Sequence, residues 1–157
     1  MPPVQSSYDI NHAQAYPGQP GNMGPQSTVS RVASNTIPFG YAVCRAADQT
    51  ASIPAAGLSF AGIAKRDQGR QADGSAVIQY EAGEEVAIME DGYAWGVAEE
   101  AVTAGQPVFF RRENGIPGQF RNDAVGGDAV VISGATFETD AGIGEPVLIR
   151  MPYAQDG

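Results

Sequence analysis

The stretch that decides the fold runs from Tyr80 to Arg112 and reads YEAGEEVAIMEDGYAWGVAEEAVTAGQPVFFRR. Within 85–90, Val86 and Ile88 fall on one face, and this period-2 alternation is typical of a half-buried β-strand. The alternation recurs in 93–98. A third apolar run, 108–110, follows a proline, which is tolerated at the start of a strand. The stretch therefore predicts three short strands separated by turns.

The middle strand of this stretch has two unlike faces. Tyr93, Trp95 and Val97 share one face, whereas positions 94, 96 and 98 on the other face are alanine or glycine. We expect Trp95 to be largely buried, either in the core or at a subunit contact, because a large ring contributes most when it leaves water. The small residues would let another sheet or chain approach the second face closely.

Two sequence patterns that predict turns recur along the chain. Asp73-Gly74, Asp91-Gly92 and Asn114-Gly115 predict two-residue hairpins, because both central positions of such a turn need a positive φ. The second signal is a glycine three residues before a valine that begins an apolar run. It occurs in GEEV (83–86), GQPV (105–108) and GEPV (144–147), and more loosely in GYAV (40–43).

The last two strict copies extend to GQPVFFR and GEPVLIR, so Arg111 and Arg150 occupy equivalent places. We expect both side chains to project from their strands and to be available to acidic partners. The copies are unevenly spaced, so they do not indicate a solenoid. We interpret each as the same local arrangement, in which a glycine turns the chain and a strand then crosses the core, and a true internal duplication remains the alternative.

Residues 31–157 predict an all-β fold, a single β-sandwich or barrel-like domain. We count eight to ten short strands at spacings near ten residues, with turn signals between them. We expect 46–57 to be a loop, Gly62 to mark a bulge or a close approach, and 97–103 to be the one helical possibility.

Residues 1–30 differ from the rest, because they are rich in proline and glycine and have no periodic apolar pattern. We interpret them as an extended N-terminal arm whose isolated apolar residues dock on a partner. The expected anchors are Tyr8, Ile10, Tyr16 and Met23. A free tail is the alternative.

Composition and net charge exclude several classes of protein. Lys and Arg number 9 against 18 Asp and Glu, for a net charge of −9, which argues against nucleic acid and against an anionic membrane surface. Cys44 is the one cysteine, so no intrachain disulfide is possible, and its apolar surroundings predict an inert thiol. Without a signal peptide or a membrane-length apolar run, the chain is expected to be made in a cytoplasm.

Catalytic chemistry is not visible in the sequence. The one histidine, His12, lies in the arm, and no phosphate cradle, calcium loop or zinc ligand cluster is present. We therefore expect no catalytic residues, no metal and no cofactor. Glu99-Glu100 is read as a solvated pair, with a carboxylate-dependent hydrolase as the weaker alternative. Tyr93, Trp95, Phe109 and Phe110 could stack on sugars, although core or subunit packing is favoured.

The order of these motifs resembles the small capsid cement, or decoration, proteins of tailed double-stranded DNA bacteriophages. That family shows a run of G-x-x-V, a short strand, G-x-x-W-V, an acidic loop and A-G-x-P-V. Here the run is carried by Gly83, Val86, Gly92, Trp95, Val97, Glu99, Glu100, Gly105, Pro107 and Val108. The resemblance covers about 36–151, and Gly96 departs from it because the family more often has a larger residue there.

The resemblance implies a non-enzymatic virion protein on the outer capsid surface, made in the host cytoplasm. It implies that the protein bridges major capsid proteins and forms a homo-oligomer, a dimer or trimer. Tyr93, Trp95, Phe109, Arg111 and Arg150 are the expected subunit or capsid contacts. A carbohydrate- or receptor-binding module on the virion is the alternative.

Overall fold

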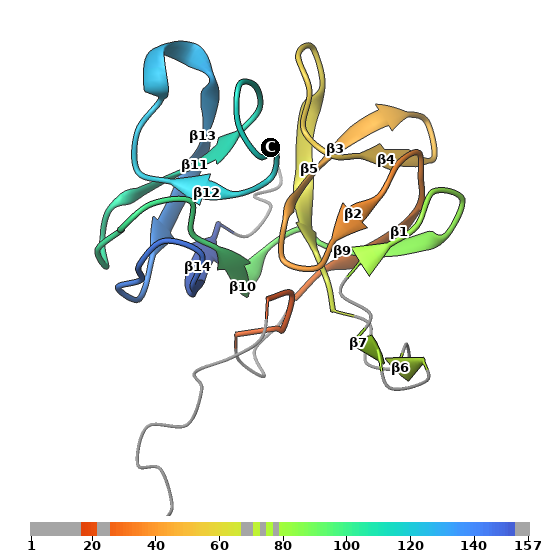
Figure 1. Ribbon diagram of the computed structural model, residues 1–157, viewed down its shortest axis with the longest axis horizontal. Helices are drawn as coiled ribbons and strands as arrows, with labels where there is room; N and C mark the ends of the chain where they lie inside the picture. The colour runs from red at the N-terminus through yellow and green to blue at the C-terminus, as the bar shows by residue number, and fades with distance from the viewer. Residues whose placement is uncertain (1–16, 22–25, 67–70, 73–74, 77–78, 153–157) are drawn as a thin grey trace, which may run out of the picture.

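Two β-lobes lie side by side (Figure 1) in the structure, a computed structural model that describes residues 17–21, 26–66, 71–72, 75–76 and 79–152. The first lobe is a closed barrel with the strand order β1-β4-β3-β5-β9. Its strands are β1 (Thr28–Ala33), β3 (Ala42–Ala47), β4 (Thr50–Ser52), β5 (Ser59–Ala64) and β9 (Glu85–Met89). Two short ladders accompany the barrel, β2 (Ile37–Pro38) with β8 (Gln79–Tyr80), and β6 (Gln71–Ala72) with β7 (Ser75–Ala76).

The second lobe is a five-stranded sheet with the order β10-β14-β13-β11-β12. Its strands are β10 (Gly92–Val97), β11 (Pro107–Arg111), β12 (Phe120–Arg121), β13 (Ala129–Phe137) and β14 (Pro146–Met151). The sheet curls back on itself, because the Glu99 amide, just beyond β10, donates to the Phe120 carbonyl at 2.7 Å. A 3₁₀ turn, η1 (Val125–Gly127), is the one helical segment in the described part of the chain.

The expected all-β fold is confirmed, with three local corrections. The fourteen strands exceed the expected eight to ten because several are only two or three residues long, and one of these, β4, lies in the expected loop 46–57. The one helical possibility, 97–103, is not a helix in the structure. Asp91-Gly92 is not a hairpin, because β9 pairs with β1 and β5 while β10 pairs with β14.

The repeated glycine pattern has one physical cause. In each copy the residue after the glycine donates its amide to the carbonyl three residues earlier, and the glycine has a positive φ, as a type II turn requires. Those turns are 38–41, 81–84, 103–106 and 142–145. In the three strict copies, the side chain of Glu84, Gln106 or Glu145 also accepts the first amide of its turn. The expected tight turns are confirmed, and Pro107 and Pro146 open β11 and β14 as predicted.

Two apolar clusters fill the lobes. The first lies inside the barrel and includes Ile37, Phe39, Val43, Tyr80, Val86 and Ile88. The second spans both lobes, because Ala42, Cys44, Ile63 and Met89 of the barrel pack with the buried residues of the second sheet. Phe60 of β5 stacks on Phe110 of β11 with ring centroids 5.2 Å apart. The lobes therefore share one core.

Residues 17–21, which we call the strap, bind both lobes and lie at their junction in Figure 1. The Gly18 amide donates to the Trp95 carbonyl at 2.7 Å, and the Trp95 amide donates to the Gln19 carbonyl at 3.0 Å. On its other side the Gly18 carbonyl accepts the Arg66 amide at 2.7 Å. The strap thus covers the edge of β10 and ties it to the chain that follows β5.

Glycine allows two close approaches that the sequence indicated. At Gly62, β3 and β5 shift register, and an added Cβ would meet the Met89 carbonyl oxygen of β9, so the expected bulge is confirmed. At Gly96 an added Cβ would lie 2.6 Å from the Phe120 ring. The small face of β10 therefore faces the core and admits a ring, which accounts for a glycine where the resemblance led us to expect a larger residue.

We predict that Gly96→Ala lowers the free energy of unfolding by about 1–3 kcal/mol, because the fully buried Phe120 ring has no space into which to move. Urea unfolding followed by tryptophan fluorescence measures this. Gly142→Ala is the matched control, since its added Cβ would meet only the Glu145 carboxylate, at an ordinary 3.4 Å. Equal unfolding midpoints for the two variants would contradict the proposed packing.

Candidate functional site

The outer face of the second lobe carries most of the expected contact residues. On β10, Ala94 and Gly96 point into the core, and Tyr93 and Trp95 lie half-buried on the opposite side. The register places Tyr93 beside Arg150 and Trp95 beside Leu148. Of the two expected places for Trp95, the core is excluded, because Ala94 and Gly96 take the inward positions. A subunit contact stays a prediction.

Two further residues extend this outer face across the sheet. Phe109 of β11 is half-buried and pairs in register with Val131 of β13, whose exposed fraction is 49%. Phe110 points the other way, into the shared core. The four aromatic residues considered for sugar stacking therefore do not share one surface. We call Tyr93, Trp95, Phe109, Val131, Leu148 and Arg150 the outer face.

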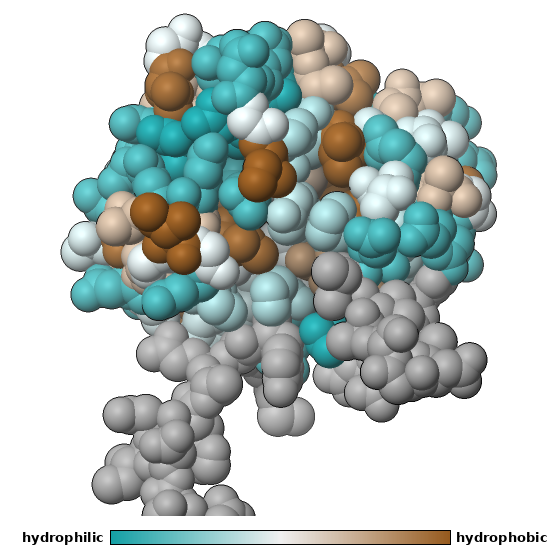
Figure 2. All heavy atoms as spheres, viewed as in Figure 1, coloured by the Kyte–Doolittle hydropathy of each residue, from teal (hydrophilic) through white to brown (hydrophobic). Residues whose placement is uncertain are grey.

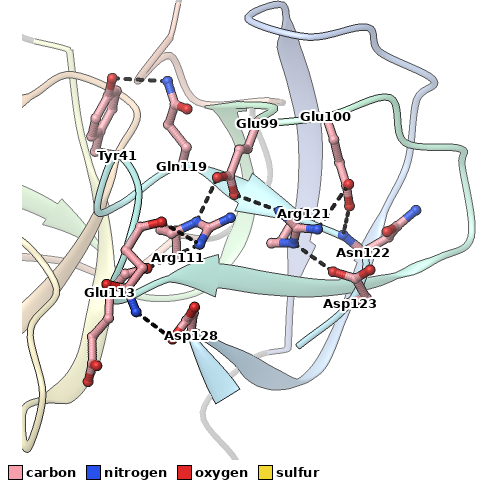
Figure 3. Close-up of polar contacts among 11 residues, drawn as sticks. Tyr41, Glu99, Glu100, Arg111, Glu113, Gln119, Arg121, Asn122, Asp123 and Asp128 are labelled. Atoms are coloured by element: carbon pink, nitrogen blue, oxygen red, sulfur yellow. Dashed lines mark hydrogen bonds and ion pairs between the residues drawn. The ribbon is translucent and has the colours of Figure 1, made fainter. Parts of the chain in front are cut away.

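Arg111 is turned inward, in contrast to Arg150. Its side chain is 8% exposed, and its Nε donates to Glu99 Oε1 at 2.6 Å (Figure 3). The same guanidinium also donates to the carbonyls of Glu113 and Asn114, each at 3.1 Å. The expectation that Arg111 is available to acidic partners is wrong, because its guanidinium is buried and already paired with Glu99 of the same chain.

Arg121 of β12 completes this ion-pair network. Its guanidinium bridges Glu99 at 3.3 Å, Glu100 at 3.1 Å and Asp123 at 2.6 Å. Burial alone would lower the pKa of Arg121, but the Asp123, Glu100 and Glu99 carboxylates outweigh it and raise the pKa. Glu99-Glu100 is therefore not a purely solvated pair. It fastens the loop after β10 to β11 and β12, a role that sequence spacing does not reveal.

The expected arm anchors Tyr8, Ile10, Tyr16 and Met23, together with His12, lie outside the described residues. What the structure does describe is the root of the arm, the strap, which the sequence did not distinguish from the rest. The signal that could have found it is the pair of glycines at 18 and 21. An added Cβ on Gly18 would lie 2.7 Å from the Arg66 amide nitrogen.

A pocket of about 410 Å³ opens beside the strap, at the junction of the lobes. Its apolar walls are formed by Pro17, Pro38, Phe39, Tyr41 and Val97. Arg66 and Gln79 supply its polar part, and the Arg66 guanidinium lies 5.9 Å from the centre of the Phe39 ring.

The described residues offer little for metal or nucleophilic chemistry. Among them, His, Cys, Asp and Glu side chains nowhere gather in threes that could hold a metal ion. Burial raises the pKa of the Cys44 thiol to about 11, so this side chain is an unreactive core residue. Within the same residues, no helix has the length and apolar character that membrane-spanning helices need.

Comparison with known proteins gives the family. The model of a structural cement protein family (E217 gp24/Pam3 gp6) matches residues 4–151. This chain belongs to the phage structural cement protein family. It is a structural, capsid-stabilising protein, and the carbohydrate- or receptor-binding alternative is not favoured.

One solved structure supports this fold. The cement protein is similar to a chain from "The capsid of Myoviridae Phage XM1", with a TM-score of 0.75 and 18% identity, over 96% of this chain and 98% of that one. It is also similar to the head fiber gp8.5 N base of bacteriophage phi29, with a TM-score of 0.47 and 12% identity, over 85% and 99% of the two chains. None of the curated proteins matches it.

We predict that Glu99→Gln lowers the free energy of unfolding of the cement protein by about 1–3 kcal/mol, because Arg111 stays buried without its carboxylate. Chemical denaturation measures the loss. Glu113→Gln is the control: its pair with Arg112, 3.4 Å apart, is far more exposed, and less than about 1 kcal/mol is expected. A Glu99 variant as stable as the control would show that the network is dispensable.

We further predict that Cys44 resists thiol reagents in the folded protein at pH 8. With a pKa of about 11, roughly one thiol in a thousand is ionised at that pH, and the side chain is fully buried. Ellman's reagent should therefore modify Cys44 promptly in urea and hardly at all in native buffer. Rapid modification of the native protein would mean that the lobes separate readily.

Proposed function

We propose that this cement protein binds the outer surface of an icosahedral phage capsid and bridges neighbouring copies of the major capsid protein. In this proposal it acts as a homo-oligomer, and its role is structural rather than catalytic. The observation that carries the proposal is the family match over residues 4–151, which takes in the N-terminal arm as well as both lobes.

The body is suited to act as a rigid block. The lobes share one core, and backbone hydrogen bonds also cross between them, such as that from the Ala42 amide to the Gly118 carbonyl at 2.8 Å. A bridging protein must transmit force between the molecules it joins. A body whose halves are packed and hydrogen-bonded together can do so without opening at the junction.

The outer face is the surface of the body that we propose contacts the capsid or a neighbouring copy. Trp95 and Phe109 supply aromatic area, Val131 supplies an exposed apolar side chain, and Arg150 supplies an exposed cation. Aromatic residues and arginine are enriched in protein interfaces. On the side of the molecule seen in Figure 2, apolar residues form only small groups among hydrophilic ones. The outer face combines apolar side chains with Arg150, so the contact is expected to be mixed in character.

The arm is the second contact in this proposal. Within the expected arm of residues 1–30, the strap and the start of β1 at Thr28 are hydrogen-bonded to the body. Residues 1–16 precede the strap and, fully extended, could reach about 50 Å at 3.3 Å or slightly more per residue. Prolines at positions 2 and 3 reduce the entropy that such a segment loses on docking. Because the strap fixes the arm's root to both lobes, tension on the arm is delivered to the whole body.

We predict that deleting residues 2–16 leaves a folded protein that no longer protects capsids. The deletion stops short of the strap and of β1, which begins at Thr28, so the thermal midpoint of the protein itself should not change. The measurement is to mix each protein with bare capsids, pellet them, and then heat the decorated capsids and follow DNA release.

The control for this experiment is a full-length chain in which Gln5 and Gln14 are replaced by serine, which keeps the arm's length and its apolar anchors. This control should sediment with capsids and raise their release temperature as the parent does. If the truncated protein binds and protects equally well, the arm is a free tail and the outer face alone must account for binding.

A further inference from the structure

Ile143 is the most exposed large apolar side chain in the described part of the chain. Its exposed fraction is 79%, and the next, Ile116, has 54%. Ile143 lies in the 142–145 turn, immediately before β14. One exposed apolar residue says little by itself, because isolated ones are common on protein surfaces. Ile143 is different because this chain builds the same turn twice more without it.

The two other strict copies of the glycine pattern carry alanine where this turn carries isoleucine. Ala82 in the turn before β9 and Ala104 in the turn before β11 stand immediately before the glycine, and both are exposed. In the turn before β11, an amide side chain, Gln106, accepts the hydrogen bond that Glu145 accepts here. The turn therefore needs neither the isoleucine nor the carboxylate in order to form.

The turn holds Ile143 on a fixed support. The Glu145 amide donates to the Gly142 carbonyl at 3.1 Å, and Glu145 Oε2 accepts the Gly142 amide at 3.0 Å. The loop after β10 supports the turn as well, because the Gly144 amide donates to the Ala98 carbonyl at 2.8 Å and the Ala98 amide to the Glu145 carbonyl at 3.0 Å. A side chain on so ordered a backbone loses little entropy when a partner covers it.

Negative charge flanks this apolar side chain. The loops 98–106 and 138–145 are joined by backbone hydrogen bonds and contain no lysine or arginine. Asp140 and Glu145 are exposed, and neither makes an ion pair within the described residues. We call Asp140, Ile143 and Glu145 the acidic tip. It combines a prominent apolar side chain with carboxylates that have no cation beside them.

The charge of the acidic tip bears on which molecule it fits. The chain has a net charge of −9, so a second copy approaches the tip against electrostatic repulsion. Of the lysines and arginines that the structure describes, only Arg45 and Arg150 are largely exposed, and they lie in different lobes, on β3 and β14. A partner with clustered lysine or arginine complements the tip better than this chain does.

We propose that the acidic tip docks on the major capsid protein, with Ile143 entering an apolar depression whose rim carries lysine or arginine. Asp140 and Glu145 would then face those cations. In such a contact the central apolar side chain supplies most of the affinity, and the charges at the rim steer and orient the approach. This inference rests on the proposed function, because the capsid supplies the partner, and it adds a contact separate from the outer face and the arm.

Binding of the full-length protein to bare capsids, measured by pelleting over a range of concentrations, tests the inference. Ile143→Ala should bind at least tenfold more weakly than the parent and keep its melting temperature, because alanine already stands at this place in both sister turns. Ile116→Ala is the matched control, since Ile116 is exposed between β11 and β12, outside the acidic tip, and should bind within twofold of the parent. Equal binding by the two variants would overturn the inference.

A second variant tests the charge of the partner. Asp140→Asn/Glu145→Gln removes two charges but keeps the side-chain oxygens that accept the Ala104 and Gly142 amides. We expect it to bind several-fold more weakly than the parent at low salt and to lose less affinity as salt is added, because it has fewer charges to screen. If the double variant and the parent have the same salt dependence, the partner does not present cations to the tip and the inference is wrong.

Sedimentation velocity without capsids separates a capsid protein from a second copy as the partner. The parent and Ile143→Ala should have the same oligomeric state, and a variant that loses subunits would show that Ile143 is seated on a second copy, which overturns the inference. The binding assay also separates this inference from the proposed function. A parent that fails to bind capsids refutes both, whereas a parent that binds no better than Ile143→Ala refutes only the docking of the acidic tip.

Discussion

The second lobe packs on the outward side of barrel strands β3 and β5, and the rest of the structure depends on that contact. A closed barrel of five short strands can enclose only a small cluster, so part of its apolar surface must be covered from outside. Cys44 and Ile63 point out of the barrel and are nevertheless fully buried, because the second sheet covers them. The stacking of Phe60 on Phe110 lies in the same contact. Neither lobe has a complete core without the other.

Most strand edges in this protein are paired or covered, and this explains several features that look unrelated in the sequence. The barrel has no free edge, and the second sheet is brought nearly to closure by the pairing of β12 with the residues after β10. The remaining edge of β10 is covered by the strap. In the proposed role, many copies would be concentrated on one shell and exposed to edge-to-edge aggregation, and covered edges reduce that hazard. The strap serves this purpose while it anchors the arm.

The charge balance of the surface differs from that of the sequence. The chain has only 9 basic residues, and the pairs of Arg111 and Arg121 with Glu99, Glu100 and Asp123 are made within the second lobe. Such pairs add little net stability when exposed, but these are mostly sheltered, so losing one partner is costly. Arg111 and Arg121 are paired with carboxylates of the same lobe. Exposed Arg150 is therefore among the few arginines in the described part of the chain that remain for contact with another molecule.

By itself the sequence determined the features that depend on a few adjacent residues. The all-β class, the type II turns before β3, β9, β11 and β14, and the bulge at Gly62 follow from glycine's access to positive φ and from period-2 alternation, which are local properties. Motif order was also enough to indicate the family.

Only the tertiary structure decided which strands pair and which face of each strand points inward. Alternation gives a strand two faces but does not say which one meets the core, so Trp95 turned outward and Gly96 inward against Phe120. Asp91-Gly92 has the residues of a hairpin, yet it carries the chain from one lobe to the other, because β9 is already paired on both sides. Arg111 and Arg150 follow matching motifs. Arg111 is buried because Glu99, in the loop after β10, lies beside β11 in the folded protein. Arg150, on β14, stays exposed, and the matching motifs do not reveal this difference.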